Sequence, residues 1–388
     1  MRLCIVENLK FSNDIKKNFR QEKRDMDIIF GYSRLGKSVC DWLLSLGKKD
    51  IAFVDNSSKK VGEVYKNIPV REVSKMTHNA GGGYYIASIF HYDSIKKQLL
   101  DEGVYAESIF KIPEELIQQE KKQLIEDKRQ RRVLQFEVDI AMHCNLKCKS
   151  CHHFSPLATP EVTDFNVFHR DMDRMGELFC DCCDRIYLLG GEPLLNKDIA
   201  EYLPVARTNF PKTRIELITN GLWLGRMADR FWEALRENEI QVSVTKYPIE
   251  ADYRKMKSLC EEKGVLFEFF GSESDNKHMS YYPLDCCGRQ ESADNFYLCN
   301  MANKCITLKS GKLYPCVVPP NIYHFNNYFG ESLVVDEKDG IDIYLAKDKD
   351  EILEFLANPI PFCRYCRVQE RTYDNEWTYS HLKKEEWT

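Results

Sequence analysis

The chain has 388 residues, of which 43% are hydrophobic and 30% charged, with a formal net charge of −5. This length accommodates two or three domains, each with its own core. The ordinary composition and the slightly acidic balance give no indication of a nucleic-acid or acidic-membrane partner. Residues Met1 to Arg20 lack the apolar run of a signal peptide, and no window approaches the roughly 18 apolar residues of a membrane span. We therefore expect a cytoplasmic protein.

The first predicted domain covers residues 1–112. A short buried strand, Asp27–Phe30, leads into the turn Gly31–Gly36. An amphipathic helix (Lys37 to Leu46) and a second strand, Ile51–Asp55, follow. This β-α-β unit with a glycine-bearing first turn predicts a Rossmann-like domain, in which an acidic residue at the end of the second strand meets a ribose hydroxyl.

Two observations bear on nucleotide binding by this domain, and they point in opposite directions. Ser33 replaces the middle glycine of the dinucleotide motif, which hinders close approach of a pyrophosphate. The segment Val54-Asp55-Asn56-Ser57, with Gly62 and Ile68-Pro69-Val70, resembles the N-terminal domain of bacterial sugar acyltransferases. That resemblance implies a nucleotide-sugar site, whereas the alternative is a Rossmann-like domain without a nucleotide.

Residues 113–132 are rich in Glu, Lys, Gln and Arg, as in a solvated helix that links two domains. Residues 133–284 then alternate apolar runs with helical patterns. The predicted strands are Leu134–Ile140, Arg185–Leu189, Arg214–Ile218, Gln241–Val244 and Leu266–Phe270. The predicted helices lie near Val167–Leu178, Asp198–Thr208, Arg226–Asn238 and Tyr253–Lys263. The pattern predicts an α/β fold, a partial (β/α)6 TIM-like barrel whose chemistry gathers at the C-terminal ends of the strands.

Three cysteines follow the first barrel strand in a CxxxCxxC spacing: Cys144, Cys148 and Cys151. Three thiolates in one loop can cap three irons of a cubane cluster, for which a complete ligand set has four cysteines. The fourth iron keeps an open coordination position, as in catalytic metal sites. The chain has sixteen cysteines, and only Cys4 and Cys40 precede residue 144. In a cytosolic chain of this length such cysteines indicate metal binding rather than disulfides.

Further motifs end the next strands. Gly190-Gly191-Glu192-Pro193 follows the second strand, Thr219-Asn220-Gly221 the third and Thr245-Lys246-Tyr247-Pro248 the fourth. The cysteine motif, GGEP and TNG, in this order and at these places, resemble the radical SAM superfamily.

The resemblance implies that Cys144, Cys148 and Cys151 hold a 4Fe–4S cluster whose open iron binds S-adenosylmethionine (SAM). It further implies roles in binding the cofactor. Gly190, Gly191 and Pro193 belong to the motif at its methionine part, and Glu192 accepts from its ammonium. Asn220 lies near the ribose, and Lys246 pairs with the carboxylate, or else is a solvated surface lysine. Ser150 departs from the family, in which an aromatic residue usually precedes the third cysteine.

Five of the seven cysteines in residues 285–388 form a pattern that suits a metal centre: Cys299, Cys305, Cys316, Cys363 and Cys366. Ser310-Gly311 between two short apolar runs predicts a hairpin. The pattern resembles the twitch or SPASM extension of radical SAM enzymes and implies one auxiliary 4Fe–4S cluster. We favour Cys305, Cys316, Cys363 and Cys366 as its ligands, although Cys299 fits the family spacing better. A zinc site is the alternative.

Three functions from different classes fit these features. The first is a radical SAM enzyme that oxidises, epimerises or dehydrates a sugar or nucleotide sugar, with a reducing partner such as a flavodoxin or a ferredoxin. The second is a peptide-modifying maturase. The third is a non-catalytic iron–sulfur protein, against which the intact GGEP motif argues. His143, His152 and His153, beside the cysteine motif, are assigned no role, and the oligomeric state is left open.

Overall fold

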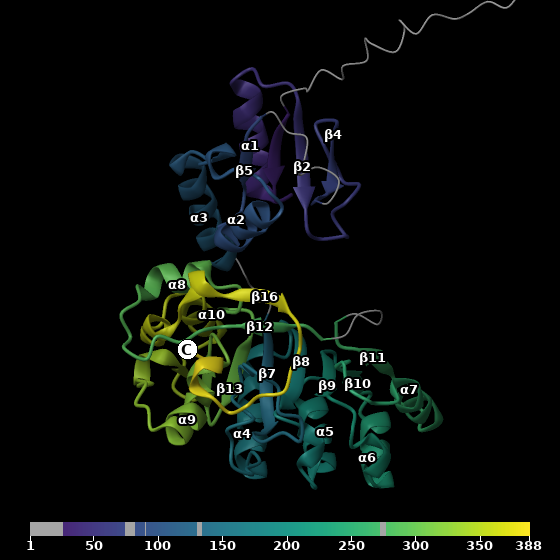
Figure 1. Cartoon of the computed structure of the whole chain (residues 1–388). Coiled ribbons are helices and arrows are strands. Elements are labelled where there is room, and N and C mark those ends of the chain that lie inside the picture. The colour runs from purple at the N-terminus through teal and green to yellow at the C-terminus, as the bar shows by residue number, and fades with distance from the viewer. Residues whose placement is uncertain (1–25, 74–81, 90, 130–133, 272–276) are drawn as a thin grey trace, which may run out of the picture. The chain divides into compact units, whose positions relative to one another are not determined.

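The computed structural model describes residues 26–73, 82–89, 91–129, 134–271 and 277–388 (Figure 1). The predictions that concern residues 1–25 and the end of the charged linker, 130–132, lie outside the described residues. The chain forms two compact units, Met1–Glu120 and Lys121–Thr388. No helix of the described residues has the length and apolar character needed to cross a membrane.

In its described residues, the first unit contains a sheet of six strands, two complete α-helices and the start of a third. The strands are β1 (Asp27–Phe30), β2 (Ile51–Asp55), β3 (Val64–Tyr65), β4 (Ile68–Glu72), β5 (Tyr84–Ile86) and β6 (Ile109–Phe110). The helices are α1 (Arg34–Ser45) and α2 (Tyr92–Asp101), and α3 (Glu114–Arg129) begins in the first unit and ends in the second. The strand order is β3-β4-β2-β1-β5-β6, and all neighbours except β3 and β4 run parallel. Without β3, the five strands have the order 3-2-1-4-5, as in the first five strands of a doubly wound dinucleotide-binding fold.

Helix α1 begins where the sequence predicts a turn after the first strand. The Ser33 side chain accepts a hydrogen bond from the Gly36 N–H and so caps the helix. The helix then buries Leu35, Val39 and Leu43, which recur at helical spacing against the sheet. Ser33 therefore uses the helix N-terminus at which a dinucleotide fold would bind phosphate.

The second unit contains the expected alternation of strands and helices. Its parallel strands are β7 (Leu134–Ala141), β8 (Cys183–Gly190), β9 (Arg214–Thr219), β10 (Gln241–Val244) and β11 (Phe267–Phe269). The helices between them are α4 (Phe165–Phe179), α5 (Ile199–Asn209), α6 (Asp229–Glu237) and α7 (Tyr253–Glu262). Helices α4, α5 and α6 lie along one side of the strands (Figure 1). The C-terminal ends of the strands therefore share one edge, where the motif loops emerge.

Side chains of β7 alternate between two environments, as the period of a strand requires. Phe136 and Val138 belong to the apolar core that includes residues of α4 and α5. Glu137 and Asp139 point to the opposite face, yet they are only 7% and 3% exposed. The face of the sheet away from the helices thus carries buried charged groups, which need partners.

Three strands of the remaining residues extend the same sheet beyond β7, and two others form a separate two-stranded sheet. The strands of these residues are β12 (Met279–Tyr281), β13 (Ile306–Lys309), β14 (Lys312–Tyr314), β15 (Ile341–Asp342) and β16 (Thr372–Asn375), and their helices α8 (Ser292–Leu298), α9 (Val318–Phe329) and α10 (Lys349–Leu356). Strand β13 pairs in parallel with β7, and β14 pairs antiparallel with β13 through the predicted hairpin. Ser310 and Gly311 have φ of 49° and 77°, as a tight hairpin turn requires. Because of the β7–β13 pairing, residues 285–388 share a compact unit with the barrel strands rather than standing apart.

Candidate functional site

The loop after β7 places the three cysteines of the first motif around one pocket. Cys144, Cys148 and Cys151 all line this pocket, here called the cysteine pocket, which has a volume of about 250 Å³. The buried Leu146 side chain fixes the middle of the loop, and its N–H donates to the Cys144 sulfur at 3.3 Å. The predicted grouping of these cysteines at one strand end is therefore present in the structure.

The chemistry of this donor set fits a positively charged metal cluster. Burial, followed by the neighbouring Cys151, raises the pKa of the Cys148 thiol to about 12. Burial and the Glu192 carboxylate likewise raise the pKa of Cys144. Thiols in such surroundings ionise when a metal supplies the opposing charge. The three sulfurs are thus suited to binding iron and poorly suited to existing as free thiolates.

Within the residues that the structure describes, no three Cys, His, Asp or Glu side chains converge closely enough for a single metal ion. A zinc ion binds each sulfur at about 2.3 Å and therefore draws its ligands close together. A cubane cluster offers a separate iron to each thiolate, so its ligands enclose a larger volume. The described cysteines are all free of disulfides.

The GGEP segment after β8 packs directly on the beginning of the cysteine loop. The Gly191 N–H donates to the Ala141 carbonyl at 2.7 Å, and the Glu192 N–H donates to the His143 carbonyl at 3.0 Å. A Cβ at Gly191 would lie 2.1 Å from the His143 oxygen, so only glycine allows this approach. Gly190 and Gly191 both line the cysteine pocket. The structure therefore gives these glycines a role in joining the two loops, in addition to the role the family resemblance implies.

Glu192 is completely buried and is not among the residues that line the cysteine pocket. Its carboxylate accepts from the Thr219 hydroxyl at 2.6 Å, the Asn220 N–H at 2.9 Å and the Leu194 N–H at 3.1 Å. Burial raises its pKa to about 7, although these three donors oppose the shift. Glu192 thus links the second motif to the third. Pro193, which follows it, begins a short 3-10 helix and is also buried.

Asn220 brings the third motif against the cysteines. Its side-chain amide donates to Asn145 at 2.8 Å and lies 3.8 Å from the Cys144 sulfur. Its oxygen accepts from the Leu222 N–H at 3.0 Å. Asn220 lines the cysteine pocket, as expected for a residue near the cofactor.

The structure separates the two residues at the end of β10. Tyr247 lines the cysteine pocket, and burial raises its pKa well above the usual value. Lys246 instead lines a neighbouring open hollow that it shares with Arg254 and Lys255. Two lysines line the cysteine pocket: Lys149 of the cysteine loop and Lys277, which sequence reasoning missed because it lies in a segment without a motif.

A later segment, residues 377–387, covers the cysteine loop and is called the strap here. The Lys149 N–H donates to the Thr378 carbonyl at 3.1 Å, and the Ser380 N–H donates to the Lys147 carbonyl at 2.8 Å. The Ser150 hydroxyl donates to the Glu386 carbonyl at 2.6 Å. The small Ser150, where the family usually has an aromatic residue, therefore accommodates the strap.

Aromatic side chains of the strap take part in this cover. The Trp387 indole N–H donates to the Cys151 carbonyl at 3.0 Å. Trp377 lines the cysteine pocket and packs against Tyr247, with ring centroids 5.6 Å apart. The sequence contains no local signal for these contacts, because they join residues more than 100 positions apart.

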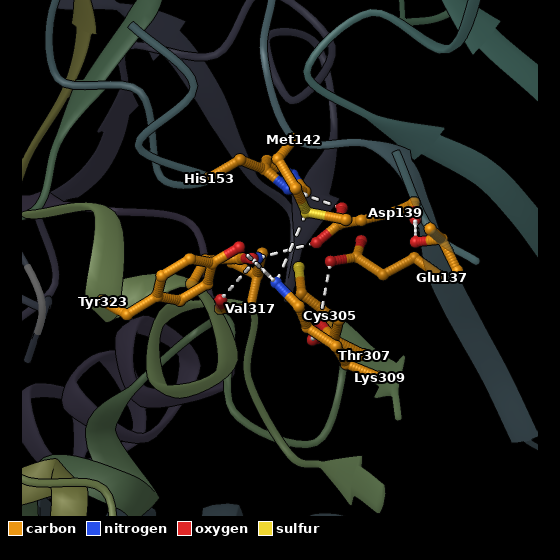
Figure 2. Close-up of polar contacts among 11 residues, drawn as sticks. Glu137, Asp139, Met142, His153, Cys305, Thr307, Lys309, Val317 and Tyr323 are labelled. Atoms are coloured by element: carbon orange, nitrogen blue, oxygen red, sulfur yellow. Dashed lines mark hydrogen bonds and ion pairs between the residues drawn. The ribbon is translucent and has the colours of Figure 1, made fainter. Parts of the chain in front are cut away.

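Beside the cysteine pocket, the buried polar face of the sheet forms a continuous network (Figure 2). His153, which lines the pocket, pairs through Nδ1 with Asp139 at 3.0 Å. The other Asp139 oxygen accepts from Asn321 of α9 at 2.8 Å. Asn321 in turn accepts from the Lys309 ammonium at 2.7 Å. Four residues from different segments thus form one chain of hydrogen bonds that begins at the pocket.

The charges in this network support one another. Burial opposes ionisation of Asp139, but His153 and Lys309 hold its pKa at about 2. Burial also disfavours protonated His153, but Asp139 raises its pKa to about 9. Glu137, which accepts from the Thr307 hydroxyl at 2.9 Å, has a pKa raised to about 7 by burial. The network therefore combines ionised groups with hydrogen-bond donors and acceptors near the pocket.

The second group of cysteines also comes together in space. Burial raises the pKa of Cys316, and the next contributions come from Cys299 and Cys366. Burial also raises the pKa of Cys363, and the next contributions come from Cys366 and Cys299. Cys305 contributes at Cys316, but less than these two. The arrangement therefore favours Cys299 over Cys305 as the partner of the other three.

Cys299 has the surroundings of a thiolate ligand. Its sulfur accepts from the N–H groups of Met301 and Ala302, both at 3.3 Å, and from Arg371 Nη1 at 2.9 Å. Against the effect of burial, Arg371 lowers the pKa of Cys299. Asn295 donates to the carbonyls of Cys363 and Cys366 and so fixes the turn of the CxxC pair. Arg371 has no motif around it and could not be identified from the sequence.

Comparisons with known proteins agree with this geometry. A family model described as Radical SAM superfamily matches residues 139–259. A GTP 3',8-cyclase of Nautilia profundicola is 25% identical over 108 residues, which cover 28% of this chain and 34% of that protein. A probable GTP 3',8-cyclase of Methanocaldococcus jannaschii is 30% identical over 126 residues, which cover 31% of this chain and 39% of that protein. The chain thus spans about a third of the length of these relatives.

Among solved structures, BtrN in complex with AdoMet and 2-DOIA matches with a TM-score of 0.39 and 17% identity, covering 61% of this chain and 94% of that chain. The family match confirms the prediction made from the three motifs. Residues 139–259 form a radical SAM domain, the kind of enzyme domain that binds a 4Fe–4S cluster and SAM.

Proposed function

We propose that this protein is a radical SAM enzyme that removes a hydrogen atom from a polar small molecule, a sugar or nucleotide sugar, and so oxidises, epimerises or dehydrates it. The observation that supports this most is the meeting of three motif loops at one pocket, lined by Cys144, Gly190 and Asn220. When bound, the cluster supplies the electron that cleaves SAM to methionine and a 5'-deoxyadenosyl radical, which abstracts the hydrogen atom.

The residues around the pocket have separate tasks in this proposal. Cys144, Cys148 and Cys151 hold the cluster. Gly190 and Gly191 expose backbone groups to the methionine part of SAM, and Asn220 lies beside the cysteines. Glu192 holds the GGEP and TNG loops together from behind the pocket and keeps their backbone groups oriented. The strap excludes water from the cysteine loop.

The substrate class follows from the polar network beside the pocket. In this network the charged groups and amides of His153, Asp139, Asn321 and Lys309 alternate and bond to one another. His153 lines the pocket, and a pocket wall backed by such a polar network suits a molecule with several hydroxyl groups. The GTP cyclases among the relatives favour a nucleotide-linked substrate as the variant to test first.

Cys299, Cys316, Cys363 and Cys366 are proposed to hold one auxiliary 4Fe–4S cluster in a twitch-like or SPASM-like part of the chain. Their mutual electrostatic influence and the N–H donors at Cys299 support this choice. A buried Arg371 Nε, which has no hydrogen-bond partner in the described residues, points to an acceptor beside these cysteines. Bridging sulfides of a cluster are acceptors of this kind.

The first unit is proposed to be a Rossmann-like domain without a bound nucleotide. Asp55, at the position expected to meet a ribose, already accepts from the Tyr32 N–H at 2.7 Å and the Ser57 N–H at 2.9 Å. It also pairs with Lys60 at 3.1 Å. These donors occupy the carboxylate and leave it little capacity for a ribose hydroxyl.

Anaerobic reconstitution followed by iron analysis and product detection tests the catalytic assignment. We expect about eight irons per chain, as two 4Fe–4S clusters require. Cys148→Ala should lower this to about four irons, as one remaining cluster requires, and should abolish 5'-deoxyadenosine formation from SAM and dithionite. Cys180→Ala, which changes an exposed cysteine outside both groups, is the matched control. Persistent SAM cleavage by the Cys148 variant would refute the assignment.

The substrate class is tested by ligand-induced thermal shifts with a panel of nucleotide sugars, free sugars, GTP and short peptides. A hit is then followed by transfer of deuterium from labelled substrate into 5'-deoxyadenosine. Transfer from a sugar supports the proposal. Transfer from a peptide alone would overturn it in favour of a peptide-modifying enzyme.

A further inference from the structure

Arg371 occupies an unusual position for a cation, in contact with one of the proposed ligands of the auxiliary cluster. It follows the 3-10 helix Val368–Glu370 in the chain, directly precedes β16, and is buried, at 5% exposure. Nη1 lies 2.9 Å from the Cys299 sulfur. Burying a guanidinium is costly unless anionic groups or strong acceptors surround it. The charge of Arg371 therefore requires a negative partner at this place.

The described residues satisfy only part of this requirement. The Arg371 guanidinium carbon lies 4.4 Å from the centre of the Tyr282 ring, a cation–π contact. Its Nε is buried and has no hydrogen-bond acceptor in the described part of the chain. A donor left in this way next to Cys299 indicates an acceptor that belongs to the centre bound by the cysteines.

Tyr282 connects this arginine to the other cysteine group. Its ring packs edge-on against His152, with centroids 4.1 Å apart. His152 follows Cys151, and its Nε2 lies 3.4 Å from the Ser280 carbonyl. The contacts therefore run without interruption from Cys299 through Arg371, Tyr282 and His152 to the loop of the first cluster. Arg371 is placed between the auxiliary cysteines and the region in which the substrate reacts.

We propose that Arg371 is a positioning residue that raises the reduction potential of the auxiliary cluster and so makes it a better acceptor for an electron from the substrate radical. This inference rests on the auxiliary cluster proposed above. One-electron reduction makes the cluster and its thiolates more negative by one charge. A fixed buried cation beside a ligand sulfur stabilises the reduced state more than the oxidised one, because net charge and hydrogen bonds to the sulfurs set the potential.

The test is an EPR-monitored redox titration of the full chain reconstituted with both clusters. The signal that changes on addition of SAM identifies the cluster of the first motif, and the other signal reports the auxiliary cluster. Arg371→Gln should lower the one-electron reduction constant of the auxiliary cluster at least tenfold, a shift of about 59 mV to more negative potential. Arg371→Lys keeps the charge but loses the fork of donors, so its potential should lie between the two.

Arg367→Gln is the matched control, because it removes a charge next to Cys366. Arg367 pairs with Glu370 at 3.5 Å and its side chain is 37% exposed, so solvent screens its charge. In the Arg367→Gln variant, the reduction potential of the auxiliary cluster should stay at the wild-type value. If the Gln variant loses iron, the Lys variant still provides the comparison.

The outcomes separate this inference from the proposed function. A second signal in the wild type with an unchanged potential in both Arg371 variants overturns the role of Arg371 alone. A wild-type chain with about four irons and one signal contradicts the auxiliary cluster itself, and the role of Arg371 with it. An equal shift in Arg367→Gln would show a general charge effect and would also overturn the inference.

Discussion

The buried hydrogen bond from Thr219 to Glu192 offers a sharp test of how the motif loops are held together. The Thr219 hydroxyl donates to the fully buried Glu192 carboxylate at 2.6 Å. The hydroxyl oxygen of Thr219 also accepts from the Gly221 N–H at 2.9 Å. Thr219→Val preserves the shape of the side chain and removes both interactions. Thr213→Val is a matched change at a residue that is equally buried, where the hydroxyl donates to the neutral Cys183 carbonyl at 3.0 Å.

The two substitutions should differ in cost. A hydrogen bond to a charged group contributes about 1.5–3 kcal/mol, and a neutral one about 1 kcal/mol. Adding the lost acceptor of Gly221, we expect Thr219→Val to lower the free energy of unfolding by about 2.5–4 kcal/mol and Thr213→Val by about 1 kcal/mol. Urea unfolding of the cluster-free chain, followed by tryptophan fluorescence, measures both. Four of the five tryptophans lie in the second unit, so the signal reports mainly on it.

The pH dependence provides an independent check on the charge of Glu192. Burial raises the pKa of Glu192 from 4.5 to about 7. Between pH 4.5 and pH 7, Glu192 therefore keeps a proton in the folded chain that it has lost in the unfolded chain. Stability contributed by this group is present at low pH and is lost as the pH rises through 7. The Thr219 hydroxyl favours the ionised form, so the penalty of Thr219→Val should grow between pH 6 and pH 8. Equal penalties for the two variants, or a Thr219 penalty independent of pH, would refute this account of Glu192.

Three further predictions concern the neighbouring contacts. Gly191→Ala should lower the free energy of unfolding in urea by about 2–3 kcal/mol and weaken SAM binding. Gly225→Ala is the control, because a Cβ there meets nothing within 4 Å, and it should change the free energy of unfolding by no more than about 0.5 kcal/mol. Asp139→Asn should bring the His153 pKa, now about 9, below its ordinary value of 6.5. NMR titration would show this, and the variant should lose the wild-type decline in stability between pH 6.5 and 9. Trp387→Phe removes the donor to the Cys151 carbonyl and should accelerate loss of cluster absorbance in air; an unchanged rate would contradict a shielding role of the strap.

Strands β7 to β10 could be predicted because each is a short apolar run that ends in a polar motif, whereas β12, β15 and β16 were not predicted. Gln241–Val244 was predicted with the bounds that the structure shows, and β7 extends one residue beyond the expected Leu134–Ile140. The polar side of β7 was also visible in the sequence, since Glu137 and Asp139 alternate with apolar residues. What the sequence did not indicate was that these charges are buried, because their partners come from β13 and α9.

The cysteine loop shows a second limit of sequence reasoning. Spacing alone identified Cys144, Cys148 and Cys151, since all three lie in one loop. It left the choice between Cys299 and Cys305 open, because both precede the same hairpin. Contacts between distant segments, such as Arg371 with Cys299, leave no periodic or local signal in the sequence.

The strap also has a consequence for the order in which the protein is built. The Ser150 hydroxyl bonds to a residue 236 positions later, so the cover over the cysteine loop forms only after that stretch has been translated. At about 5–20 residues per second this takes roughly 10–50 s. Within that interval the strands from β8 to β11 are themselves translated, while the cysteine loop still lacks its cover. The strap can therefore close over the cysteine loop only after all the parallel strands of the radical SAM domain have been made.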